Sequence, residues 1–179
     1  MRLVWRPVQH DALTAVESAG VSVRIHEVLE SWVGTPYMEG QGVRGVATDC
    51  VRAVAGVLND LFGYVRAPLE RLPQDVALHA PDTARAALRR FLAIYQPHRR
   101  LERGEPVEAG DVLVAGYNGP GHALIAGASQ WSLYHATEFA GFHRAGRSAF
   151  APAADGRPLQ LFAVYRIGDK HKWASKQPS

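Results

Sequence analysis

The stretch that decides the fold spans residues 34–63 and reads GTPYMEGQGVRGVATDCVRAVAGVLNDLFG. Its first half, residues 34–49, is rich in glycine and contains a proline, which predicts an irregular loop. Its second half predicts a helix over residues 50–62, because its apolar residues recur at helical spacing and Gly63 follows as a stop. The junction between loop and helix is therefore the start of a helix, and the residues there are the first candidates for function.

Cys50 lies at this junction. Thr48 and Asp49 occupy the position of an N-cap, so Cys50 belongs to the first turn of the helix. Unpaired N–H groups and the positive end of the helix dipole lie there, and both favour a thiolate over a thiol. Cys50 is also the single cysteine of the chain, which excludes an internal disulfide and the class of small disulfide-bonded secreted scaffolds. The alternative is a buried structural cysteine that acts as a small apolar residue.

The rest of the chain predicts helices first and strands afterwards. A helix is predicted over residues 21–33, and a polar segment with several prolines, residues 65–108, is predicted to hold one more helix. Helices followed by strands indicate an α+β domain with a mainly antiparallel sheet. We expect one domain over residues 1–168 and a basic, frayed tail over 169–179. The additional helix is expected at residues 82–95, and the strands at 111–116, 122–127, 132–137 and 159–167.

Length, composition and charge exclude several classes. A chain of 179 residues buries roughly 70% of its unfolded surface, enough for a core without metals or disulfides. The net charge of +3 comes with no basic motif interleaved with aromatic residues, so no nucleic-acid partner is expected. Charged residues interrupt the first twenty positions, and no apolar run reaches the roughly 18–20 residues of a membrane span. We therefore expect no signal peptide and no membrane span, and a product that is cytoplasmic on synthesis.

Two histidines are candidate partners for Cys50. A nucleophilic cysteine needs a base within hydrogen-bond reach and a third group that orients the base. His122 opens one predicted strand and His135 lies in the next, so the two become neighbours if the strands form a hairpin. Either histidine taken alone is more commonly structural. A zinc site built from His122, His135 and His143 is a further alternative, but no HExxH or CxxC spacing supports it.

Three motifs in this order resemble the NlpC-type family of cell-wall cysteine peptidases. Family members read W-x-G-T-P-Y, a Gly-rich loop and D-C at a helix start, then G-D-x-x-x-F, a turn and H-x-G-I-Y-x-G, then a small motif in which His precedes Ala. The matching stretches are SWVGTPYMEGQGVRGVATDCVRAVAGVLNDLFG (31–63), AGDVLVAGYNGPGHALIAG (109–127) and LYHAT (133–137). The resemblance implies a papain-like α+β fold in which the nucleophile helix packs on a small antiparallel sheet.

The resemblance also implies a role for each candidate residue. Cys50 corresponds to the nucleophile, His122 to the general base and His135 to the group that orients the base. Tyr37 corresponds to a loop tyrosine near the oxyanion, although a tyrosine that only packs on the domain is the alternative. Asp49 corresponds to an acidic residue that helps to recognise the free amino end of a peptide stem, in addition to its role as a helix cap. No metal and no organic cofactor is implied.

The implied activity is hydrolysis of peptidoglycan stem peptides, at the bond between D-glutamate and the diamino acid. The family reads D-C-S-G, whereas here Val51 and Arg52 follow the cysteine, which affects substrate recognition. The long segment between Cys50 and His122 is similar to phage-tail-associated members, so phage-tail proteins are expected partners and association with a virion or export is an expected location. Two alternatives remain open: a phage-tail or assembly component that acts by binding, and an acyltransferase that uses the same cysteine.

Overall fold

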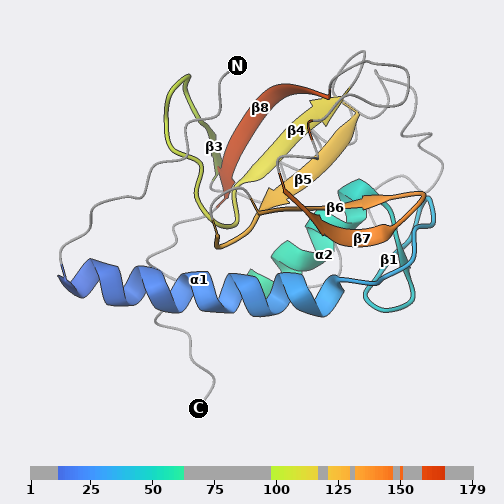
Figure 1. Cartoon of the computed structure of the whole chain (residues 1–179), viewed down its shortest axis with the longest axis horizontal. Coiled ribbons are helices and arrows are strands. Elements are labelled where there is room, and N and C mark those ends of the chain that lie inside the picture. Colours follow the sequence, from blue (N-terminus) through green and yellow to red (C-terminus); the bar gives the residue numbers. More distant parts are fainter. Residues whose placement is uncertain are drawn as a thin grey trace.

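The computed structural model describes residues 12–62, 98–116, 121–129, 132–146, 150 and 159–167 of the chain. Within this part, two helices come first and most strands follow them (Figure 1). The elements are, in order, α1 (Ala12–Trp32), β1 (Gly42–Val43), β2 (Ala47–Thr48), α2 (Cys50–Phe62), β3 (His98–Arg100), β4 (Val112–Gly116), β5 (His122–Ala126), β6 (Leu133–Thr137), β7 (Gly141–Ala145) and β8 (Gln160–Ile167). The protein is therefore α+β, as its sequence predicts.

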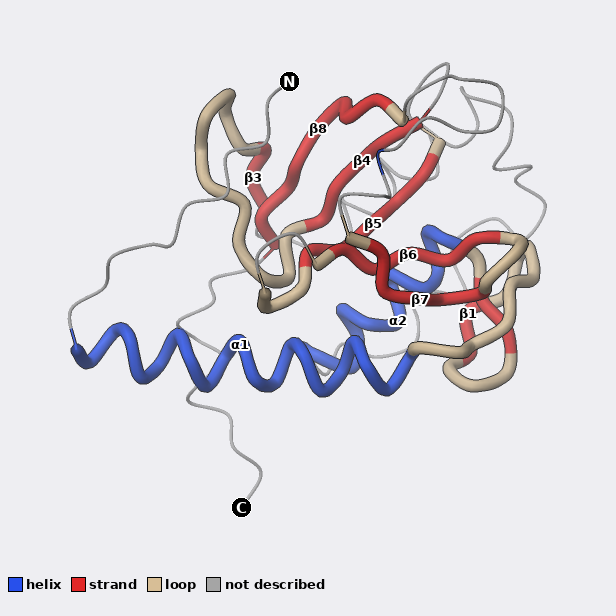
Figure 2. The backbone as a smooth tube through the Cα atoms, viewed as in Figure 1, coloured by secondary structure: helices blue, strands red, loops and turns tan. Residues whose placement is uncertain are grey.

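Six of the strands form one antiparallel sheet in the order β3-β8-β4-β5-β6-β7. Strands β4, β5, β6 and β7 lie beside one another in chain order, and β8 returns to pair with both β4 and β3. Figure 2 shows α2 between α1 and the sheet, in agreement with the contacts of α2 with α1, β5 and β6. Strands β1 and β2 form a separate pair in the loop between the helices. This topology places the first residues of β5 and α2 close together.

Helix α2 is the buried centre of the fold. Every residue at positions 50–58 is buried, and the apolar ones join one core with α1 and the inner face of the sheet. Trp32, at the end of α1, packs against Gly56, where a Cβ atom would come within 2.2 Å of the indole ring. The indole N–H of Trp32 donates to Asp60 at 2.9 Å, which holds the two helices in register. The apolar stripe read from the sequence is thus buried on nearly all sides.

The central strands of the sheet have two buried faces. Side chains of β4 and β5 alternate between two apolar clusters, as the period of two in a strand requires. The second cluster, on the face away from the helices, also takes Leu101, Val107 and Leu159 from the segments next to β3, β4 and β8. The first cluster includes Val112, Val114, Ala123 and Ile125, and the second includes Leu113, Ala115, Leu124 and Ala126. The sheet is therefore a rigid support for the polar residues at its ends.

The predicted helix over residues 50–62 and the four predicted strands are confirmed. Helix α1 differs from the prediction, because it begins at Ala12 and not at residue 21. Its first residues, ALTAVESAG, include several strong helix formers and no proline, so propensity extends the helix beyond its apolar periodicity. No helix of the described chain is long and apolar enough to cross a membrane.

Strands β1, β2, β3 and β7 are not among the strands that the sequence predicts, and β1 and β2 form a short pair within the loop predicted to be irregular. Strand β7, GFHRA, carries two polar side chains and lacks a run of β-branched residues, so its sequence alone is a weak strand signal. It forms because β6 offers an unpaired edge, and five residue pairs join the two strands. The predicted helix over residues 82–95 and the predicted tail over 169–179 lie outside the described residues.

Candidate active site

Cys50 is the first residue of α2 and its side chain is buried. The backbone N–H groups of Ala123, in β5, and of Val51 and Cys50, in the first turn of α2, each act to lower the pKa of the thiol. Ala123 directly follows His122 in the chain. The fold therefore brings the start of α2, with Cys50, to the start of β5, with His122.

His122 and His135 are hydrogen-bonded to each other. Nε2 of His122 lies 2.6 Å from Nδ1 of His135, and the two rings meet edge to face with their centroids 4.9 Å apart. The residues belong to the neighbouring strands β5 and β6, so the hairpin expected from the sequence makes this contact. With Nε2 of His122 engaged by His135, Nδ1 is the ring nitrogen left to exchange a proton with a reacting group.

A third histidine, His143, lies next to His135 on the adjacent strand. His143 in β7 is the direct cross-strand partner of His135, and their ring centroids are 4.5 Å apart. Nδ1 of His143 lies 3.0 Å from the carbonyl oxygen of Gly141, to which it donates. The sequence placed His143 only in the zinc alternative. Among the described residues, no group of three or more His, Cys, Asp or Glu side chains is arranged to hold a metal ion.

The pKa values of Cys50, His122 and His135 are shifted in the directions that favour their uncharged forms near neutral pH. Burial lowers the pKa of His122 to about 4 and that of His135 to about 3, with a smaller contribution from the neighbouring histidines. Burial, and then the negative charge of Asp49, raises the pKa of Cys50 to about 12. The N–H groups at the helix start do lower the pKa of the thiol, as the sequence predicts, but desolvation is larger. Burial therefore opposes the effect of the helix start on the pKa of the thiol.

Tyr37 lies in the loop that covers the helix start. Its backbone forms a bridge with Thr48, and the carbonyl of Pro36 accepts the N–H of Thr48 at 2.8 Å. Burial is the main cause of a raised pKa for the Tyr37 phenol, and the charges of Cys50 and Asp49 are the next causes. The phenol therefore stays protonated, and its hydroxyl is a hydrogen-bond donor in the neighbourhood of Cys50.

Asp49 caps α2, as predicted, and in addition forms a buried ion pair. Its Oδ1 accepts the backbone N–H of Arg52 at 2.8 Å, which is the N-cap contact. Its Oδ2 accepts Nη1 of Arg52 at 2.6 Å and the N–H of Gly40 at 3.0 Å. Sequence reasoning treated Arg52 only as a departure from a motif. The spacing of three residues between Asp49 and Arg52, on one helix face, is the signal that indicates the pair.

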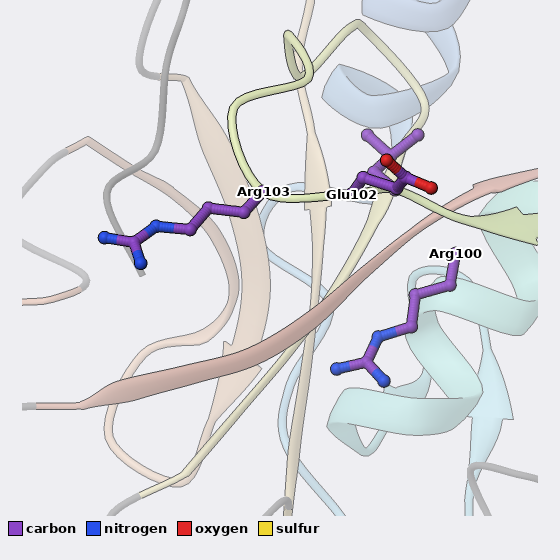
Figure 3. Close-up of a pocket in the computed structure, with 4 residues that line it drawn as sticks. Arg100, Glu102 and Arg103 are labelled. Carbon is purple, nitrogen blue, oxygen red and sulfur yellow. The ribbon is translucent and has the colours of Figure 1, made fainter.

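A second polar region lies away from these residues. A hollow of about 580 Å³ is lined by Arg100, Leu101, Glu102 and Arg103, at the end of β3 and in the loop that follows (Figure 3). Arg100 donates through Nη2 to the carbonyl of Phe162 at 3.0 Å, so β8 holds this side chain. None of the lining residues belongs to the group around Cys50, and none is a nucleophile or an imidazole base. The candidate active site is therefore the region of Cys50, His122 and His135.

Comparison with known proteins identifies the fold. No family model matches the chain, and no curated protein matches it in sequence. Among solved structures, the chain is similar to the NlpC/p60 domain of the peptidoglycan hydrolase SagA, with a TM-score of 0.52 and 15% sequence identity. The match covers 82% of this chain and 98% of that domain. The protein thus has the papain-like α+β fold of an NlpC/p60 domain.

Proposed function

We propose that the protein is a cysteine peptidase that hydrolyses peptidoglycan stem peptides, with Cys50 as nucleophile, His122 as base and His135 as the group that orients the base. The observation that carries the proposal is the hydrogen bond of 2.6 Å between His122 and His135, in the part of the sheet where β5 packs against α2 and Ala123 shares a core cluster with Cys50. The fold likeness to a domain of a peptidoglycan hydrolase supports the substrate class.

The proposed reaction starts from a neutral thiol and a neutral imidazole. Because the pKa of Cys50 is raised and that of His122 is lowered, proton transfer from sulfur to Nδ1 of His122 accompanies attack and does not precede it. The sulfur bonds to the amide carbon, and the negative charge that develops on the oxygen is stabilised by the backbone N–H of Cys50 and the Tyr37 hydroxyl. The protonated His122 then gives its proton to the departing amine, and water hydrolyses the thioester.

The proposed substrate bond joins D-glutamate to the diamino acid of the stem. This assignment rests on the motifs around Cys50, His122 and His135. Hydrolysis there releases a new amino end on the diamino acid, and a soluble stem peptide provides a defined substrate on which this product is identified by mass spectrometry.

The test of the proposed function uses the fact that the chain has one cysteine. We expect the purified protein to release stem fragments from murein, and iodoacetamide to remove this activity in proportion to label on Cys50. Alkylation is expected to be slow, because the thiol is buried and protonated. Release of the same fragments by fully alkylated protein would exclude Cys50 as nucleophile, and no release by the unmodified protein would exclude the activity.

The pH dependence of the reaction reports the state of His122. A base must be unprotonated, and burial lowers the pKa of His122 to about 4, so kcat/KM falls as the pH drops through about 4 and not near the ordinary value of 6.5. Measurement on a soluble stem peptide gives this profile. Below about pH 6.5 the histidines of the unfolded chain bind protons that the folded site does not, so the free energy of unfolding also falls as the pH drops. Circular dichroism at each pH separates this unfolding from titration of His122. A kinetic limb near pH 6.5 in folded protein would contradict the lowered pKa of His122.

A further inference from the structure

Beside the nucleophile lies an ion pair that is closed off from solvent. Asp49 is 0% exposed and Arg52 is 5% exposed. The carboxylate accepts three hydrogen bonds from the protein, two of them from Arg52. Both oxygens of Asp49 are therefore occupied, although this is the carboxylate closest in sequence to the attacking sulfur.

The loop before α2 closes over this pair and holds it. A Cβ atom on Gly42 would come within 2.9 Å of Cβ of Arg52, so the backbone of the loop lies directly on the arginine side chain. The N–H of Asp49 donates to the carbonyl of Gln41 at 3.0 Å, and the N–H of Gly40 reaches the carboxylate. Arg52 is thus enclosed between α2 and residues 40–42, and it does not reach outward to contact a ligand.

A buried carboxylate needs a cation or several donors to offset its desolvation. Arg52 supplies the positive charge from within the chain, one helix turn from Asp49, and a tethered guanidinium is present at a high effective concentration. An ammonium group on a substrate would have to displace the guanidinium from Oδ2 of Asp49, at the cost of a buried ion pair and its charged hydrogen bond of 2.6 Å. Asp49 therefore offers no net attraction to a substrate amine.

We propose that Arg52 takes the place of a substrate ammonium beside Cys50, so that the enzyme cleaves stem peptides whose amino end is acylated as readily as those whose amino end is free. The inference rests on the proposed peptidase function. It names Arg52 as a residue that determines specificity through Asp49, without contact to the substrate. The substrate class that it predicts includes stems still attached to other groups through an amide at the amino end.

The experiment compares two synthetic stem peptides that differ only in a free or an acetylated amino end. For the unmodified protein we expect kcat/KM values within about threefold of each other, since this difference is below that of one charged hydrogen bond. In the Arg52→Ala variant, Asp49 is left without its cation, and we expect the preference for the free amine to rise by about tenfold or more. Arg52→Lys, which keeps a cation, is expected to restore much of the original ratio.

Arg44→Ala is the matched control, because Arg44 is a half-exposed arginine whose partner is Asp60. We expect this variant to keep the original ratio for the two peptides. A preference of more than tenfold for the free amine in the unmodified protein overturns the proposal, whether or not Arg52→Ala folds. An unchanged ratio in folded Arg52→Ala overturns it as well. Cleavage of neither peptide by the unmodified protein instead removes the peptidase function on which the proposal rests.

Discussion

Replacing Cys50 with alanine is expected to lower kcat for stem-peptide hydrolysis by about 10⁶-fold, to the level that binding and the oxyanion donors sustain alone. The sulfur is the only thiol of the chain and the group that forms the covalent bond in the proposed reaction. Because Cys50 is buried in an apolar core, alanine removes one polarisable atom and leaves a small void, so a modest loss of stability accompanies the loss of rate.

The measurement is the release of the new amino group from a soluble stem peptide, together with thermal unfolding of both proteins. Cys50→Ser is the matched control, because it places a hydroxyl where the thiol was. The side chain stays polar and similar in shape, while the nucleophile becomes much weaker. We expect both variants to retain binding of the peptide, which isothermal titration measures. If Cys50→Ala hydrolyses the peptide at the rate of the unmodified protein, the activity does not use this cysteine. Binding without turnover in the unmodified protein would instead support the alternative of a binding component.

Replacing His122 with alanine is expected to lower kcat/KM by about 10⁴-fold. The thiol stays protonated because burial and Asp49 raise its pKa to about 12, so without a base the attacking species is scarcely populated. His135, in the neighbouring strand β6, loses its hydrogen-bond partner in this variant and is not expected to take over its role. The loss is therefore expected in kcat more than in KM, since His122 acts on the transferred proton and not on substrate binding.

His26→Ala is the control for His122→Ala, because His26 is a half-exposed histidine of α1. We expect this variant to keep the activity of the unmodified protein. Circular dichroism and a melting curve establish that His122→Ala is folded before rates are compared. A folded His122→Ala variant with unchanged kcat/KM would remove the proposed base and would point to another proton acceptor.

Capping and apolar spacing, which involve only neighbouring residues, were sufficient to predict helix α2. Asp49 as N-cap, the apolar spacing of residues 51–61 and Gly63 as a stop together predict α2 with the bounds that it has. The order of helices and strands predicts the α+β class, and the alternating or apolar runs predict four of the strands. Strand β7 is not predicted in this way, because a short polar segment forms a strand only when a neighbouring strand, here β6, has an unpaired edge.

The site shows the same division between local and long-range effects. The motif residues Cys50, His122 and His135 are evident in the sequence. The spacing of three residues between Asp49 and Arg52 is also one at which a helix allows an ion pair. Their protonation states do not follow from the sequence, because they depend on burial by distant segments. The helix start and its N–H groups at Cys50 are evident from the sequence, whereas desolvation by the surrounding core, which raises the pKa of the thiol, follows only from the fold.

The sequence by itself determined that Cys50 starts a capped helix after a glycine-rich loop, because capping and helical periodicity act over a few neighbouring residues. Only the tertiary structure decided that His122 and His135 share a hydrogen bond, that the ring of His143 lies next to that of His135, and that the loop at 40–42 encloses Arg52 against Asp49. These contacts join segments that strand pairing and the packing of α2 bring together. Burial, which sets the charges of the site, is a property of that packing and of no single segment.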